Sequence, residues 1–189
     1  LLPDDEAPSH TLYRDRDGRW VAETSTDTHL LDDGQVIIAG GRPWSVSLPG
    51  QLAETLTPQA ELSLAAAELC FIVSRDEEHI EMHVAPQRAG AAVVEFEGRA
   101  HFALLLTLAR ARIEDAMRPE LSSSDHGWVH REDLPRMLAV EPELIHVWIH
   151  RARKQLSRRG IRDGAWIIER RARGSQLRIG VSRLAVHRG

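Results

Sequence analysis

The run IHVWIHRARKQL (Ile145–Leu156) and, shortly after it, WIIERRARGSQLRIGV (Trp166–Val181) decide the fold of this chain of 189 residues. In the first run apolar residues recur every three to four positions, the period of an α-helix with one buried face. We expect this helix to begin at Pro142, because proline suits the first helical turn, and to end at Gly160. The second run predicts two strands, Trp166–Arg170 and Gln176–Val181, joined by a basic turn that contains Gly174. A helix followed by a basic hairpin is therefore expected.

The predicted helix separates its apolar and polar side chains. The apolar face consists of Ile145, Trp148, Ile149, Ala152 and Leu156. The polar face consists of His146, His150, Arg153, Lys154 and Ser157, with Arg151 and Arg158 at its flank. We expect the apolar face to pack on a preceding helix and the polar face to offer donors to solvent or to a groove. An α-helix fits the major groove of DNA, where Arg and Lys donate to guanine. An ordinary amphipathic surface helix would show the same pattern.

The charge of the chain is distributed unevenly along the sequence. The net charge is -4, but residues 1–98 hold 6 basic and 18 acidic residues, whereas residues 99–189 hold 18 basic and 10 acidic. The excess is greatest in residues 143–189, with 12 basic and 3 acidic residues. A basic segment on an acidic body favours nucleic-acid binding, because cationic side chains release counterions from phosphates. A merely solvated charged face is the alternative.

The sequence pattern as a whole predicts an α+β chain with two domains, in which the helix that begins at Pro142 is the third helix. Residues 62–189 are expected to hold a small antiparallel sheet, three helices and a β-hairpin wing. The sheet strands are predicted at 69–74, 79–84 and 92–97, and the first two helices at 102–117 and 131–138. Residues 1–57 are expected to form a partial β-sandwich, with strands at 11–14, 20–24, 35–39 and 44–48. Pro49–Pro58 has the composition of a linker.

The two quoted runs resemble the winged-helix output domain of response-regulator transcription factors of the OmpR/PhoB type. The resemblance covers residues 62–186, since a small antiparallel sheet precedes the helices in that family also. It implies that the third helix reads the major groove of double-stranded DNA and that the hairpin tip touches the minor groove. The expected DNA-binding residues are His146, His150, Arg151, Arg153, Lys154, Arg158, Arg171 and Arg173. The short connection Ala139–Glu141 departs from the family, which has a longer loop there.

The segment GRWVAETSTDTHLLDDGQVIIAGGRPWSVSLP (Gly18–Pro49) resembles the last strands of a forkhead-associated (FHA) domain, a β-sandwich that binds phosphothreonine. That family binds its ligand through an early Gly-Arg, a Ser-x-x-His and a loop asparagine. This chain has only the adjacent Ser9-His10 and contains no asparagine. We therefore expect a degenerate or truncated FHA module, and no phosphopeptide-binding residue is assigned. The resemblance implies a protein or phosphoprotein as a second partner.

Other chemistry has little support in the sequence. The only lysine, Lys154, follows Arg153 rather than glycine, which excludes a G-K-[ST] phosphate-binding loop. Neither G-x-S-x-G nor H-E-x-x-H occurs, and the histidine pairs at i, i+4 lack a third metal ligand of fixed spacing. The single cysteine, Cys70, is read as a small buried hydrophobe in a reducing, cytoplasmic environment. We expect no enzyme, no cofactor, no metal and no membrane span.

Two classes of function remain. The first is a DNA-binding transcriptional regulator that uses a winged helix and carries an FHA-like interaction module. The second is a signalling adaptor in which the winged helix docks a protein partner, since a fold does not by itself fix a function.

Overall fold

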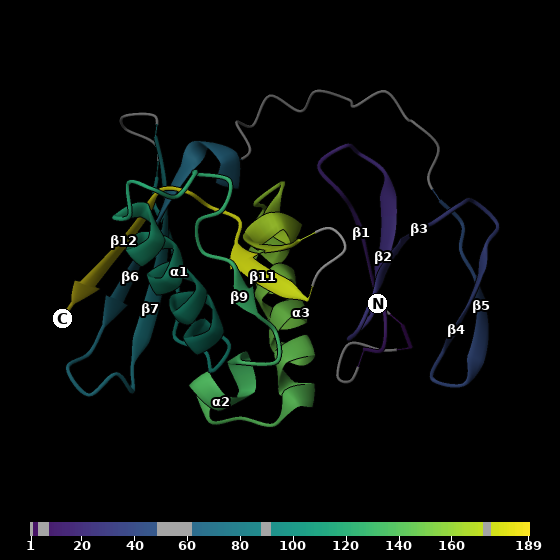
Figure 1. The fold of residues 1–189 in the computed structure, drawn as a ribbon. Helices are drawn as coiled ribbons and strands as arrows, with labels where there is room; N and C mark the ends of the chain where they lie inside the picture. Colours follow the sequence, from purple (N-terminus) through teal and green to yellow (C-terminus); the bar gives the residue numbers. More distant parts are fainter. Residues whose placement is uncertain (1, 4–7, 49–61, 88–91, 172–174) are drawn as a thin grey trace. The chain divides into compact units, whose positions relative to one another are not determined.

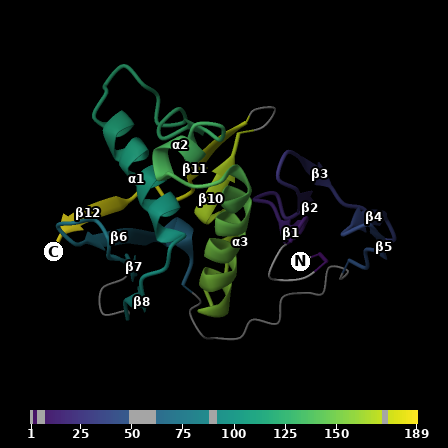
Figure 2. The same ribbon diagram turned by 90° about the horizontal axis from the view of Figure 1, so that it is seen from below.

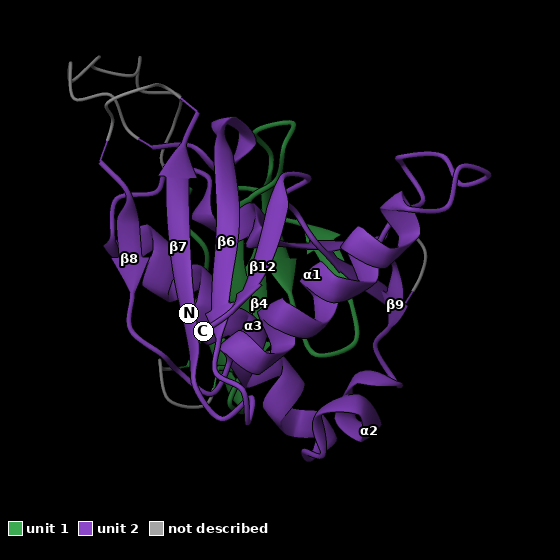
Figure 3. Ribbon diagram, turned by 90° about the vertical axis from the view of Figure 1, so that its left-hand side faces the viewer, with its two compact units in different colours: residues 1–60 green, residues 61–189 purple. Residues whose placement is uncertain are grey.

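The computed structural model describes residues 2–3, 8–48, 62–87, 92–171 and 175–189. It is a mixed α+β structure with several antiparallel sheets and three α-helices in the described part. The chain divides into two compact units, unit 1 (Leu1–Ala60) and unit 2 (Glu61–Gly189), which Figure 3 colours separately. Each unit is described by itself below.

Unit 1 consists of a three-stranded antiparallel sheet and a two-stranded hairpin. The sheet has the order β1-β2-β3, formed by β1 (Thr11–Arg14), β2 (Trp20–Glu23) and β3 (Thr28–Leu30). The hairpin pairs β4 (Val36–Ala39) with β5 (Arg42–Ser45). The strands predicted at 11–14 and 20–24 are found as an antiparallel pair, in which Arg14 lies opposite Trp20. The strand expected at residues 44–48 lies earlier, at Arg42–Ser45, because β5 follows the tight turn directly.

The main sheet of unit 2 has the order β12-β6-β7-β8. Its strands are β6 (Ala67–Val73), β7 (Ile80–Pro86), β8 (Val94–Phe96) and β12 (Leu184–Arg188). The three predicted strands are antiparallel neighbours, whereas β12 returns from the C-terminal end and pairs parallel with β6. Alternate residues of β6 are buried, so that Leu69, Phe71 and Val73 face the core as a period of two requires.

Three helices follow β8 along the chain. They are α1 (Phe102–Ala116), α2 (Leu134–Leu138) and α3 (Pro142–Arg158). Pro142 occupies the first turn of α3 as predicted, and Gly160 has a φ of +74° just past its end. Gly127, which ends the connection after α1, has a φ of +79°, and a Cβ there would lie 2.5 Å from the Cβ of Arg112. Only glycine fits at this close approach to α1.

A second, smaller sheet joins the helices to the hairpin. It has the order β10-β11-β9, formed by β9 (Val129–His130), β10 (Ile168–Arg170) and β11 (Gln176–Ile179). The strand β9 is missing from the sequence prediction because two residues are too short to show a period. The predicted strand Trp166–Arg170 begins later, at Ile168, because the chain first makes a 3₁₀ turn, η2 (Gly164–Ile167). A similar turn, η1 (Leu64–Ala66), precedes β6.

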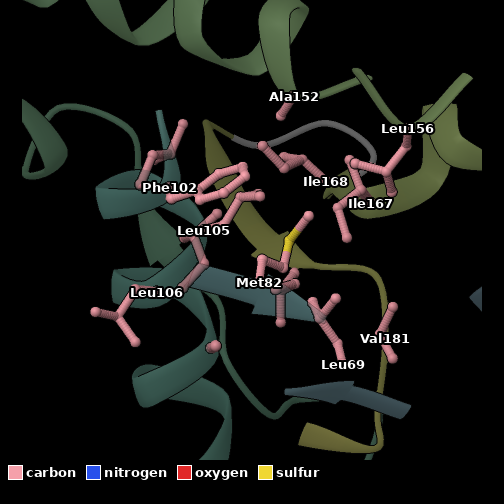
Figure 4. Packing of buried hydrophobic residues seen from close by; sticks show 14 of the residues in the cluster. Leu69, Met82, Phe102, Leu105, Leu106, Ala152, Leu156, Ile167, Ile168 and Val181 are labelled. Atoms are coloured by element: carbon pink, nitrogen blue, oxygen red, sulfur yellow. The ribbon is translucent and has the colours of Figure 1, made fainter. Parts of the chain in front are cut away.

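One hydrophobic core lies between the main sheet and the helices of unit 2. Leu69 and Met82 from the sheet meet Phe102 and Leu105 from α1 (Figure 4). Leu156 of α3 belongs to the same cluster. Figure 1 shows α1 lying against the main sheet. No helix of the described residues is long and apolar enough to cross a membrane.

Candidate nucleic-acid interface

The apolar face of α3 is buried in the core as the sequence predicted. Ile145, Ile149 and Leu156 are at most 2% exposed, and Trp148 and Ala152 belong to the same cluster. This packing fixes the rotation of α3, so the positions of its polar side chains follow from it.

The cations on the opposite side of α3 are exposed. Arg151 and Arg158 are exposed, and Lys154 is partly exposed. Arg159 and Arg162, just beyond the helix, are exposed as well, and the guanidinium of Arg159 lies 5.5 Å from the ring centre of Phe96. The end of α3 is therefore a cationic surface, and it includes two arginines that the sequence analysis did not select. The sequence feature that could have identified these two arginines is their position directly after the helix.

Three of the expected DNA-binding residues of α3 are buried in the whole chain. His146, His150 and Arg153 are 6%, 3% and 5% exposed. Their contact with DNA stays a prediction, except that one donor of Arg153 is used within unit 2. They are spaced four and three residues apart and so form one stripe along the flank of α3. On this flank the Arg153 guanidinium donates from Nη2 to the Ile168 carbonyl at 3.0 Å, which ties α3 to β10.

This hydrogen bond gives α3 and the hairpin a fixed relation within unit 2. Figure 2 shows α3 running beside β10 and β11. Main-chain pairing then continues from β10 to β11 and from β11 to β9. The cations of α3 and those at the base of the hairpin therefore belong to one packed assembly.

Of the two expected wing residues, the structure describes one. Arg171 is exposed and directly follows β10, whereas Arg173 lies outside the described residues. The Arg171 guanidinium donates from Nη2 to Asp125 Oδ1 at 2.8 Å and from Nη1 to Gln176 Oε1 at 3.0 Å. Its backbone N–H also donates to the Gln176 carbonyl. The base of the hairpin thus presents an arginine that already has an acidic partner.

Trp128 organises the cations around the hairpin base. It is only half-buried, and two guanidinium groups face its ring. Arg178 lies 4.3 Å and Arg171 lies 5.5 Å from the ring centre. Burial first, and then the charge of Arg171, lower the pKa of Arg178. The pairing of Leu177 with Val129 puts Arg178 opposite Trp128, and no sequence pattern indicates this pair because β9 is too short to be predicted.

The described residues include no group of three or more His, Cys, Asp or Glu side chains placed to hold a metal ion. Cys70 is partly buried on β6, and burial raises the pKa of its thiol.

Comparisons of the chain with protein-family models, with curated proteins and with solved structures find no match.

Proposed function

We propose that the chain is a DNA-binding transcriptional regulator, and that unit 2 binds double-stranded DNA as a winged helix through α3 and the β10–β11 hairpin. Support comes from the order of the elements. After β8 the chain runs α1, β9, α2, α3, β10 and β11, and β11 pairs with both β10 and β9. Three helices followed by a hairpin is the layout of a winged helix, which agrees with the family resemblance of residues 62–186.

The observation that carries the proposal is the cationic surface at the end of α3. Arg151 and Arg158 are exposed on a helix whose opposite face is anchored in the core, and Lys154 is partly exposed between them. Arg171 adds a fourth cation at the hairpin base. Guanidinium and ammonium groups on one side of a packed helix and hairpin suit the regularly spaced phosphates of a duplex.

A hydrogen bond within unit 2 changes the role expected of Arg153. Arg153 donates to a main-chain carbonyl, so its role in this proposal is to position the hairpin against α3. Contacts to phosphate are assigned to the exposed and partly exposed cations Arg151, Lys154, Arg158 and Arg171.

A salt titration of duplex binding tests this function. The full chain is mixed with a labelled duplex of random sequence, and the dissociation constant is measured by anisotropy over a range of salt concentrations. Four phosphate contacts predict that log K falls against log salt with a slope of about -3 to -4. A flat response, or no binding at low ionic strength, would reject the regulator and favour a protein-docking adaptor.

In the same proposal, unit 1 is an interaction module of the FHA type. The tight hairpin of β4 and β5 supports this assignment, because it lies within the run Gly18–Pro49 that resembles the last strands of an FHA domain. Its partner is a protein, and recognition of phosphothreonine is not part of the proposal, since the chain contains no asparagine.

A further inference from the structure

The base of the β10–β11 hairpin is connected to the segment that precedes β9 by a cluster of ionic and stacking contacts. At its centre, Arg178 stacks on Trp128 and donates from Nε to Glu169 Oε2 at 2.6 Å. Its Nη1 donates to the Ser124 carbonyl at 2.8 Å. The Arg178 side chain is only 13% exposed, so we regard this arginine as part of the frame of the hairpin.

Arg171, at the edge of the same cluster, is far more accessible. Its side chain is 46% exposed, and so is that of its ion-pair partner Asp125. Gln176 binds the other terminal nitrogen of the guanidinium, and the Trp128 ring lies beneath it. Gln176 and Trp128 therefore hold the guanidinium in position, and the specific contribution of Asp125 is negative charge.

We propose that Asp125 is a built-in competitor of DNA phosphate for Arg171. This inference rests on the proposed function. A carboxylate and a phosphate bind a guanidinium through the same N–H donors, so the two acceptors exclude each other at this side chain. An ion pair exposed to this extent is weak, and a phosphate fixed in a duplex can displace the carboxylate. The exchange makes the contact between Arg171 and a DNA phosphate less favourable. It thereby limits unspecific binding.

The variant Asp125→Asn separates charge from position. Asparagine keeps the Oδ1 acceptor for Arg171 but removes the charge that competes with phosphate. We expect the full-length variant to bind a random duplex about two- to fivefold more tightly than the wild type, as the loss of a weak exposed pair allows. The salt slope should become steeper by about 1, since phosphate no longer replaces an existing anion.

Asp133→Asn is the matched control. Asp133 is also 46% exposed and also pairs with an arginine, Arg136, at 3.3 Å. The change removes the same unit of charge, and we expect it to alter the dissociation constant by less than about 1.5-fold. An equal gain in both variants would overturn the inference, because the effect would then be one of net charge.

A double-mutant cycle completes the test. In an Arg171→Gln background, Asp125→Asn should have no effect on affinity, because the arginine for which carboxylate and phosphate compete is gone. Weaker binding of Asp125→Asn, unchanged binding, or a gain that persists without Arg171 would each overturn the inference. Failure of the proposed function has a different signature: neither the wild type nor Asp125→Asn would bind duplex DNA at low salt.

Discussion

The two units differ most in how much apolar surface they bury. In the described residues, the core cluster of unit 2 contains 26 buried side chains, drawn from the main sheet, all three helices and the hairpin. The corresponding cluster of unit 1 consists of Ala22, Leu31, Ile37 and Val46. Unit 1 also leaves Leu30, Val36 and Ile38 more than half exposed. Because burial supplies most of the folding free energy, unit 2 has the larger reserve of stability.

The difference in packing also bears on function. A helix can present cations at fixed positions only if its other face is held firmly, and the core of unit 2 provides this for α3. The small cluster of unit 1 provides no comparable anchor for a set of polar contacts. We therefore place the site that depends on geometry in unit 2.

The largest expected effect is the loss of a core side chain. Leu105→Ala removes a fully buried residue of α1 and should cost unit 2 about 2–5 kcal/mol of unfolding free energy. Leu31→Ala in unit 1 is the matched change, at a position that is 6% exposed among far fewer buried neighbours. Its cost should be about 2 kcal/mol or less. Hydrogen exchange of peptides from each unit measures both, and equal losses would contradict the contrast between the two cores.

Two glycines with similar backbone angles test the packing around a turn. Gly127 and Gly18 have φ values of +79° and +78°, but only Gly127 has a neighbour that blocks a Cβ. Gly18→Ala should cost about 1 kcal/mol from backbone strain alone, whereas Gly127→Ala should cost about 3 kcal/mol because Arg112 must also move. Hydrogen exchange of the two units again reports the difference. A similar cost at both positions would show that the backbone of α1 yields to the new side chain.

Two histidines, one in each unit, differ in burial, and this difference predicts a smaller effect on stability that depends on pH. Burial lowers the pKa of both His101 and His10, and His101 is the more deeply buried, with its Nε2 2.6 Å from Gln155 Oε1. A depressed folded pKa means that the unfolded chain binds the proton more readily below about pH 6.5. The stability contributed by His101 should therefore be present above about pH 6.5 and decline as the pH falls through the folded pKa.

Denaturant unfolding at about pH 7.5 and about pH 5.5 checks this titration. His101→Gln should reduce the difference in unfolding free energy between the two pH values more than His10→Gln does. If the two variants change the pH dependence equally, the burial of His101 is not the source of the effect.

No effect at all is expected when phosphothreonine peptides are offered to the chain. Unit 1 lacks the asparagine that binding in the FHA family uses, and its Ser9 and His10 are adjacent, with Ser9 Oγ 3.0 Å from His10 Nδ1. A library of phosphopeptides and their unphosphorylated counterparts should show no difference in binding to the full chain. Phosphate-dependent capture at micromolar concentration would contradict the assignment of unit 1 as a degenerate module.

The sequence predicted elements where one period dominates. The bounds of α3 follow from its apolar spacing together with Pro142 and Gly160, and the three strands of the main sheet follow from alternation. By contrast, β12 comes from the far end of the chain and pairs with β6. No local sequence pattern predicts which strand β12 will pair with. Short elements such as β9 were missed for want of length.

The residues of the candidate site could be selected from the sequence, but the exposure of their side chains could not be predicted. Helical periodicity correctly gave the apolar face of α3, and it treated all remaining positions as open to solvent. Arg153 shows why this fails: the strand that binds its guanidinium follows later in the chain and packs on the flank of the helix. The pairing of Arg171 with Asp125 likewise joins residues from two separate loops.

Removal of the α3 cations tests the central claim most directly. Arg151→Gln/Arg158→Gln deletes two exposed charges from α3, and Arg75→Gln/Arg188→Gln deletes two exposed charges from the β6–β7 turn and β12. The dissociation constant of each full-length variant for a random duplex is measured at several salt concentrations. The account predicts that the α3 variant binds about tenfold more weakly or worse, with a salt slope shallower by about 2, while the control stays within about twofold of the wild type. Equal weakening in both variants, or no weakening in either, would contradict DNA binding through α3.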